Sequence, residues 1–382
     1  MELEGVVQNY AWGKLGSESA VADLCRGDIQ GDLPYAELWM GTHPNGPAKI
    51  KATGQSLKDF IDGFEDKARL LGKEPHRAFG GALPFLLKIL SVRKALSIQA
   101  HPNKELAETL HASRPEIYKD PNHKPEMAVA LTEFEGLCGF RPLEEISTFL
   151  SEVKPLREAV GEPHASALCE GKSGALKDAF GALMQCESKV IKAQLDSMIS
   201  PNYEIPHLKD LFIRLHAEYP GDVGCFVIYF LNLVSLQPGE AMFLGPNLPH
   251  AYLRGDCVEV MATSDNVVRA GLTPKLIDVP PLLNMLIYEP TRDVRFFPKE
   301  ENPHSTLFDP PVKDFVFVRI FFPGEGGSFS KPIPRDRASF FITPRGPGNA
   351  KGQILFLKAG GSGELSFWKE ESLRAFQPFC SC

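Results

Sequence analysis

Hydrophobic residues occur in two different patterns along the chain. In residues 1–142, and again from about residue 220 onward, short apolar runs rich in strand-forming residues are separated by Gly and Pro, which predicts β-strands. In residues 143–218, hydrophobic positions recur every three or four residues, which predicts four or five helices. The clearest predicted strands are Met127–Leu131, Phe226–Leu236, Ala241–Leu244 and Val258–Met261.

These patterns predict a mainly β protein with an inserted α-helical domain. The first β-domain is built from residues 1–142 and 219–300, and the helical insert of residues 143–218 interrupts it. Residues 301–382 are predicted to form a C-terminal β-domain, which is atypical or shortened because this stretch is short for a complete second barrel. A chain of 382 residues has room for two or three domains.

Composition and charge exclude several classes of partner. The net charge is −7 and no long Lys/Arg block occurs, so neither nucleic acid nor an anionic membrane is an expected partner. No apolar stretch approaches the roughly 20 residues of a membrane span, and the N-terminus lacks the pattern of a secretion signal. The eight cysteines are scattered and form no paired Cys-x-x-Cys motif, so we expect reduced thiols and a cytoplasmic protein.

Candidate chemistry begins at Gln99 and His101, which are two residues apart. In an extended segment both side chains point to one face, while Ile98 and Ala100 point to the other face and suit a core. Two ligand-type side chains on one face can form half of a metal site. The alternative is an ordinary strand with a polar face toward solvent.

A second candidate ligand is His250, which follows two Gly/Pro turns. This arrangement resembles the second motif of the cupin barrels, in which a Gly-rich turn places a His at an interior metal. The first cupin motif normally supplies two His and a Glu; here Gln99 replaces the first His, His101 is the second, and the suitable Glu is Glu126. The fold expected from this resemblance is a cupin-like jelly-roll barrel.

Six further blocks carry a resemblance that extends over most of the chain. The blocks are Gln8–Lys14, Pro34–Pro44, Leu96–Lys104, Asn122–Glu126, Leu137–Pro142 and Ser264–Lys275. In this order, over roughly residues 5–320, they resemble the type I mannose-6-phosphate isomerases, most closely the animal cytosolic form. The resemblance implies interconversion of mannose 6-phosphate and fructose 6-phosphate through an enediolate, which supplies mannose for GDP-mannose and glycan synthesis.

The resemblance also implies one zinc ion per chain, held by Gln99, His101, Glu126 and His250. One amide oxygen, two imidazoles and one carboxylate leave Zn²⁺ with net positive charge and room for substrate oxygens. A structural zinc would more often use thiolates, and no Cys is placed for this role.

The other residues implied by the resemblance would bind the substrate or stabilise the transition state. Arg269 is the implied active-site arginine, because a permanent cation stabilises an enediolate without competing for the moved proton. Lys275 is the implied phosphate contact, with Ser97 as a hydroxyl donor. A surface cation is the alternative interpretation of Lys275.

Four residues match positions implicated in ring opening or proton transfer, namely His123, Lys124, Glu259 and Asp265. A general base must reach C1 and C2 of the sugar from one face, and the sequence does not give that geometry. We favour Lys124 and Asp265 as a pair beside the metal, with Glu259 as the rival base.

Two other functions remain as alternatives. A sugar-phosphate-binding protein without catalysis would keep the ligands but lose Arg269 or the acid–base set. A cupin oxygenase would prefer Fe(II) with His/His/carboxylate ligation. Gln99 in the ligand set, together with Arg269 and Lys275, favours zinc and a phosphorylated sugar. The expected partner is this small molecule, and a monomer is expected.

Overall fold

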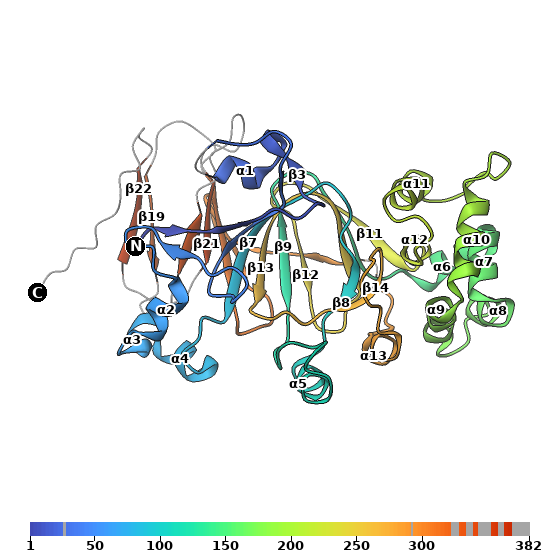
Figure 1. The fold of residues 1–382 in the computed structure, drawn as a ribbon, viewed down its shortest axis with the longest axis horizontal. Helices are drawn as coiled ribbons and strands as arrows, with labels where there is room; N and C mark the ends of the chain where they lie inside the picture. Colours follow the sequence, from blue (N-terminus) through green and yellow to red (C-terminus); the bar gives the residue numbers. More distant parts are fainter. Residues whose placement is uncertain are drawn as a thin grey trace, which may run out of the picture.

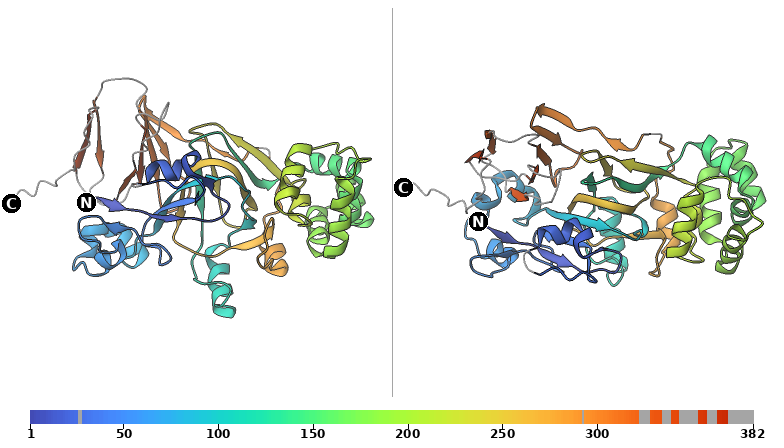
Figure 2. Two further views of the ribbon diagram at one scale, coloured as in Figure 1. Left: turned by 45° about the horizontal axis from the view of Figure 1, so that its top comes forward. Right: turned by 90° about the horizontal axis from the view of Figure 1, so that it is seen from above.

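The computed structural model describes residues 1–25, 28–291, 293–321, 328–333, 339–342, 353–357 and 363–368. The molecule is elongated, with antiparallel strands at its centre and a group of helices at one end (Figure 1). The N-terminus and the C-terminal strands lie at the other end. Two further views also place the helices of residues 143–218 beyond the end of the sheet (Figure 2).

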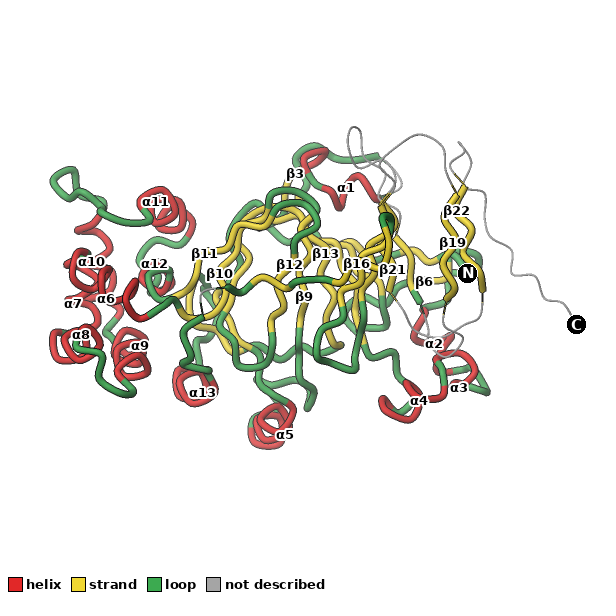
Figure 3. The backbone as a smooth tube through the Cα atoms, turned by 180° about the vertical axis from the view of Figure 1, so that it is seen from behind, coloured by secondary structure: helices red, strands yellow, loops and turns green. Residues whose placement is uncertain are grey.

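Eleven strands form the central sheet, and the long strand β13 (His250–Ala262) joins its two parts. The C-terminal part of β13 pairs with β7 (Phe85–Val92) and β9 (Glu126–Ala130). Its N-terminal part pairs with β8 (Ile98–Ala100) and β10 (Phe134–Phe140). The other strands of this sheet are β2 (Val6–Gln8), β5 (Glu37–Met40), β11 (Leu231–Leu236), β12 (Ala241–Leu244), β14 (Val268–Gly271) and β15 (Arg295–Phe296). Figure 3 shows the strands from behind, with β10 and β11 nearest the helices.

Strand β7 shows why the sheet forms a core and a cavity wall together. All eight of its residues are buried. A nearly continuous run of apolar residues is typical of a central strand that is covered on both faces. Phe85, Leu87 and Ile89 pack into one hydrophobic cluster, whereas Leu86 and Lys88 alternate with them and face a cavity. The one charged residue of this strand, Lys88, is therefore placed at the cavity.

The helical insert contains six helices, so the predicted number of four or five was wrong. They are α6 (Leu143–Glu152), α7 (Lys154–Val160), α8 (Glu162–Cys169), α9 (Ala175–Gln185), α10 (Ser188–Met198) and α11 (Lys209–Glu218). The short helices α7 and α8 were missed because each covers only about two turns. Gly161, with φ of 85°, separates them, and each begins with a proline in its first turn.

The insert and the sheet share one hydrophobic core. Phe180 and Leu215 of the helices belong to the same buried cluster as Ile98, Phe140 and Val268 of the sheet. Burial of this shared apolar surface fixes the helical insert against the strands that carry Gln99 and Arg269. Those strands are β8 and β14.

Residues 226–236 differ from the predicted single strand. Their first part belongs to a helical turn, α12 (Gly224–Val227), and the strand β11 begins only at Leu231. Every residue from Gly224 to Leu231 is buried. An apolar run buried on all sides has no polar face, so periodicity alone does not distinguish a helical turn from a strand. The other predicted strands agree with β9, β12 and β13 to within a residue or lie inside them.

The C-terminal region forms a five-stranded sheet in the order β16–β17–β18–β21–β20 and a separate pair of strands, β19 and β22. Buried Phe308 and Phe317 of this sheet pack into the cluster that contains Phe85 of β7. Within the predicted domain of residues 301–382, residues 322–327, 334–338, 343–352, 358–362 and 369–382 lie outside the described residues. The bounds are β16 (Lys299–Asn302), β17 (Ser305–Phe308), β18 (Phe317–Phe321), β19 (Ser328–Ile333), β20 (Phe340–Ile342), β21 (Gln353–Leu357) and β22 (Gly363–Trp368).

Short elements complete the fold around the main sheet. Among the described residues, no helix is both long enough and apolar enough to cross a bilayer. The remaining elements are β1 (Leu3–Glu4), β3 (Lys14–Leu15), β4 (Pro34–Tyr35), β6 (Lys49–Ile50), a 3₁₀ turn (Gly16–Glu18), α1 (Ala20–Leu24), α2 (Leu57–Asp62), α3 (Lys67–Leu71), α4 (Lys73–Phe79), α5 (Lys104–Ser113) and α13 (Val279–Met285).

Candidate metal centre and substrate cavity

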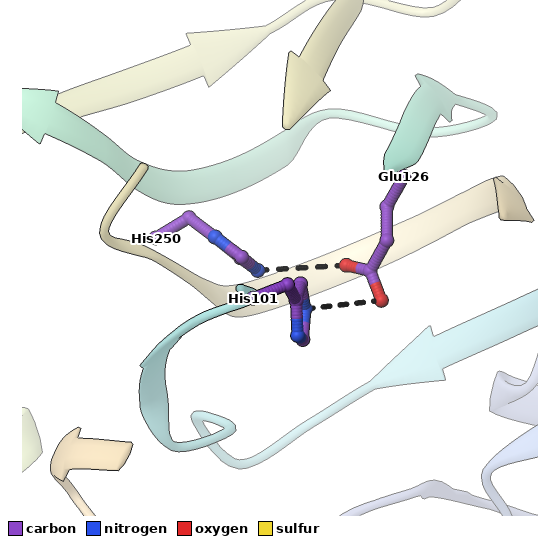
Figure 4. Close-up of side chains that lie close together, drawn as sticks. All are labelled: His101, Glu126 and His250. Carbon is purple, nitrogen blue, oxygen red and sulfur yellow. Dashed lines mark ion pairs between the residues drawn. The ribbon is translucent and has the colours of Figure 1, made fainter. Parts of the chain in front are cut away.

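Three buried side chains from different strands converge on one point (Figure 4). His101 directly follows β8, Glu126 begins β9 and His250 begins β13. The distance from His101 Nε2 to Glu126 Oε1 is 3.3 Å, and from His250 Nε2 to Glu126 Oε2 it is 3.4 Å. The three groups can therefore hold a metal ion together.

Backbone carbonyl groups orient both imidazole rings. His101 Nδ1 lies 2.7 Å from the Asn266 carbonyl oxygen, and His250 Nδ1 lies 2.9 Å from the Leu248 carbonyl oxygen. A proton on each Nδ1 leaves the Nε2 lone pair free to bind a cation, as in many metal sites. In the described part of the chain, both Nε2 atoms and Glu126 Oε2 are buried without a hydrogen-bond partner. Such atoms are costly to bury, and a bound cation would satisfy all three.

The protonation states also suit a metal. Burial lowers the pKa of His101 to about 4, so its ring is neutral near pH 7. Burial alone would raise the pKa of Glu126, but Lys124 and the two imidazoles hold this pKa well below its ordinary value. Lys124 Nζ lies 3.0 Å from Glu126 Oε1. A neutral imidazole and an ionised carboxylate are the forms that bind metals.

Gln99 lies in a row with His250 and Arg269 across three neighbouring strands. It is directly opposite His250 of β13 on one side and Arg269 of β14 on the other. Directly opposite residues of antiparallel strands project to the same face. Ile98 and Ala100 are fully buried on the other face, as the alternation predicts. Gln99 therefore faces the same space as the His–Glu–His cluster, and its Oε1 atom accepts a hydrogen bond from Ser97 Oγ over 3.2 Å.

A cavity of about 420 Å³ lies beside this cluster, which is an ordinary size for a small-molecule site. Both cationic and anionic side chains line it. Burial lowers the pKa of the Arg269 guanidinium from its usual high value. The residues from the sequence prediction that line the cavity are Ser97, Gln99, Lys124, Glu126, Glu259, Asp265, Arg269 and Lys275.

Among the predicted site residues, His101, His123 and His250 do not line this cavity; His101 and His250 belong to the cluster beside it, whereas His123 does not. Its Nε2 atom lies 3.2 Å from both carboxylate oxygens of Asp314, a buried residue in the segment that leads to β18. The side chain therefore points toward the C-terminal sheet. A proton-transfer role for His123 has no support in this arrangement.

Asp265 is held in the cavity wall by two neighbours that the sequence prediction left outside the site. His43 Nε2 lies 3.2 Å from Asp265 Oδ1, and Asn45 Nδ2 donates to Asp265 Oδ2 over 3.3 Å. The hydrogen bond from His43 lowers the pKa of Asp265. His43 is 3% exposed and lines the cavity. Another histidine, His111, lies outside the cavity lining, and its Nδ1 atom is 2.7 Å from the carbonyl oxygen of Tyr118.

The sequence prediction missed a buried charge cluster around Lys88. Its Nζ atom lies 2.9 Å from Glu259 Oε2 and 3.5 Å from Glu37 Oε2, and it lies 5.0 Å from the centroid of the Trp39 ring. Burial alone would lower the pKa of Lys88, but the two carboxylates raise it above its ordinary value. A single lysine within an otherwise apolar strand was the signal that could have identified this cluster.

We expect Lys88→Met to lower the free energy of unfolding by about 3–5 kcal/mol, because two carboxylates would remain buried without their cation. Urea denaturation measures this change. Lys58→Met is the matched control: its partner Asp62 is a surface residue, so its removal should change stability little. Adding Glu259→Gln to Lys88→Met should restore part of the loss. Equal stability of the Lys88→Met and Lys58→Met variants would contradict the cluster's structural role.

Together, the fold and the site define an antiparallel β-protein with a helical insertion and a buried His–Glu–His site that can hold a metal ion. Residues 1–143 match the sequence model of the phosphomannose isomerase type I catalytic domain, and residues 154–231 match that of its helical insertion domain. The chain belongs to the type I phosphomannose isomerase family, which confirms the resemblance predicted from sequence.

Curated relatives extend this similarity along nearly the whole chain. Mannose-6-phosphate isomerase of Bos taurus is 46% identical over 99% of this chain and 98% of its own length. The enzyme of Homo sapiens is 45% identical over the same shares of the two chains.

The fold of this chain is also similar to those of solved phosphomannose isomerase structures. A lysine-to-alanine variant of phosphomannose isomerase from Salmonella typhimurium has a TM-score of 0.74 and 33% identity, over 95% of this chain and 97% of that one. A crystal structure of mannose 6-phosphate isomerase bound with zinc and yttrium has the same TM-score, 32% identity and the same coverage.

Proposed function

We propose that this chain is a zinc-dependent isomerase that interconverts mannose 6-phosphate and fructose 6-phosphate. The observation that carries the proposal is the buried cluster of His101, Glu126 and His250, whose unpartnered atoms converge beside a cavity with cationic residues. With Gln99 these residues would hold one zinc ion per chain, and the zinc-bound relative supports the choice of metal. When bound, zinc polarises oxygen atoms of the sugar as a Lewis acid.

The other residues of the cavity would serve the substrate. The reaction moves a proton between C2 and C1 through an enediolate, whose negative charge the Arg269 guanidinium would stabilise. Ser97 and Lys275 would contact the phosphate group. Their positions in the lining of one cavity support this assignment.

Lys124 and Asp265 remain the proposed proton-handling pair. Both line the cavity, and Lys124 lies directly beside Glu126. Glu259 is the rival base, but its Oε2 atom is already paired with Lys88 at 2.9 Å. Asp265 is likewise paired with His43, so the choice of Lys124 and Asp265 rests on the position of Lys124 beside Glu126 and not on pairing.

We also propose that the sheet is a cupin-like jelly-roll barrel. The domain boundaries predicted from sequence remain part of this proposal, with the catalytic domain formed from residues 1–142 and 219–300. Two observations support it. Strand β13, which follows the helical insert in sequence, pairs with strands that precede the insert. The candidate ligands His101 and Glu126 precede the insert, and His250 follows it, yet they converge. In a cell, the proposed enzyme acts as a cytoplasmic monomer and supplies mannose for nucleotide-sugar and glycan synthesis.

Metal analysis and a coupled isomerase assay test the proposed function. We expect about one zinc ion per purified chain. We also expect the protein to convert mannose 6-phosphate to fructose 6-phosphate and to catalyse the reverse reaction. Treatment with a chelator should abolish turnover, and added Zn²⁺ should restore it. Binding of the sugar phosphate without turnover would indicate a binding protein. Iron content with oxygen consumption would indicate an oxygenase, and either result would contradict the proposal.

A further inference from the structure

The end of helix α11 contacts the loop that precedes β8. Glu218 Oε2 accepts a hydrogen bond from the Ala95 backbone N–H over 2.9 Å. The Tyr219 hydroxyl donates to the carbonyl oxygen of the same Ala95 over 2.6 Å. Both backbone polar groups of Ala95 are thus bound by the helical insert. Ala95 and Ser97 both line the cavity, so this contact fixes one of its walls.

Three residues after Tyr219, Asp222 binds the loop that follows β14. Its Oδ1 atom accepts hydrogen bonds from the backbone N–H groups of Gly224 and Leu272, each over 2.7 Å. Its Oδ2 atom accepts from the N–H of Thr273 over 3.1 Å. A carboxylate is well suited to accept several N–H groups at once, because both of its oxygens are acceptors only.

The backbone segments around Gly224 and Gly271 pack so closely that neither position has room for a side chain. A Cβ atom on Gly224 would lie 2.5 Å from the Leu272 backbone nitrogen, and one on Gly271 would lie 2.6 Å from Gly224 Cα. Leu272 itself has a left-handed backbone with φ of 51°, which is costly for a residue other than glycine. The hydrogen bond that the Leu272 N–H donates to Asp222 Oδ1 helps to hold this conformation.

The loop held by Asp222 continues into Thr273, Pro274 and Lys275, and all three line the cavity. The loop held by Glu218 and Tyr219 continues into Ser97. Ser97 and Lys275 are the residues assigned above to the phosphate group. Two loops that lie far apart in sequence are therefore bound by one short segment, residues 218–222.

We propose that Asp222, four residues after the helical insert ends, is a positioning residue that sets the phosphate-binding end of the cavity. This inference rests on the proposed function for the identity of the ligand. Asp222 does not line the cavity and touches no substrate in this scheme. Its effect is carried by the backbone of residues 272–275, and it should appear in phosphate affinity rather than in the chemical step.

Asp222→Asn tests this role on the full-length, metal-loaded protein. The variant keeps the size of the side chain but turns one acceptor oxygen into an NH₂ group that faces a backbone N–H. We expect KM for mannose 6-phosphate and the inhibition constant of inorganic phosphate to rise together by about tenfold. We expect kcat to change far less and zinc content to stay the same. Asp210→Asn, which changes an exposed aspartate in the preceding helix α11, is the matched control and should change neither constant.

A purely structural role would give a different result. In that case the active fraction and kcat would fall, while KM and the phosphate inhibition constant would stay at the wild-type values, and the inference would be overturned. If Asp222→Asn does not fold, Tyr219→Phe takes its place, because it removes the bond to the Ala95 carbonyl group. It should raise the same two constants by a smaller factor, and unchanged constants would likewise overturn the inference.

Direct calorimetry with inorganic phosphate separates this inference from the proposed function. Wild-type protein that binds phosphate but does not isomerise the sugar would contradict the proposed function alone. Weaker phosphate binding by Asp222→Asn would then still support the positioning role. If wild-type and Asp222→Asn bound phosphate equally well, the positioning role would be wrong, whatever the result of the isomerase assay.

Discussion

Glu126→Ala is expected to abolish turnover by removing zinc from the protein. Glu126 is the residue that faces both imidazoles, with oxygen-to-nitrogen distances of 3.3 Å to His101 and 3.4 Å to His250. Its loss removes the only carboxylate among the four proposed ligands and leaves Lys124 beside the site as an unpaired cation. Both changes weaken binding of a divalent cation. A metal ion supplies several kcal/mol of transition-state stabilisation, so the rate should fall by about 10³-fold or more.

Zinc quantification and steady-state kinetics on the same samples measure this effect. His101→Ala should behave in the same way, because it removes another proposed ligand. Glu126→Gln preserves the shape of the side chain and separates the loss of charge from the loss of packing. Glu133→Ala, in the exposed turn after β9, is the matched control and should keep both zinc and activity. Stoichiometric zinc with near-normal turnover in Glu126→Ala would disprove the assigned ligand set.

Arg269→Ala should lower kcat by about 10²–10³-fold and leave the zinc content unchanged. Arg269 lies directly across from Gln99, which in turn lies across from His250, so the guanidinium is next to the proposed metal site but outside the ligand set. Its charge should act mainly when the enediolate forms. An interaction that is stronger in the transition state than in the ground state affects kcat and not only KM.

Arg269→Lys should recover little activity, because the planar, two-pronged geometry of the guanidinium is lost. Arg254→Ala is the matched control: this arginine also lies on the sheet, but it is exposed and paired with Glu135. A rise in KM alone for Arg269→Ala would show that Arg269 binds the phosphate, and Lys275 would then lose that assignment. Loss of zinc from Arg269→Ala would show that the residue supports the metal site.

Local sequence was sufficient for the parts of the site that lie within single strands. Residues 98–101 show this, because the period of two in an extended strand places Gln99 on the cavity face and Ile98 in the core. Lys124 and Glu126 are also two residues apart, and they form an ion pair of 3.0 Å on one side of the chain. The order of the family blocks was likewise sufficient to identify the family.

The sequence did not show which partner a residue meets where that partner lies far away along the chain. His123 was a candidate for proton transfer, but its partner is Asp314, 191 residues further along the chain. Lys88 looked like an isolated polar residue in an apolar run, because Glu37 and Glu259 approach it only through the strands on either side of β7. Hydrophobic periodicity describes which face of an element is buried and not which element covers it.

The sequence by itself therefore determined the family, most of the strands and the candidate ligands His101, Glu126 and His250, because these depend on residue types and short-range spacing. Only the tertiary structure decided which of these side chains meet. It paired Gln99 with both His250 and Arg269, and it brought Asp222 to the backbone of Leu272, 50 residues away. Such contacts arise when apolar faces of separate segments are buried together, and the free energy of that burial is shared by the whole core rather than by any one segment.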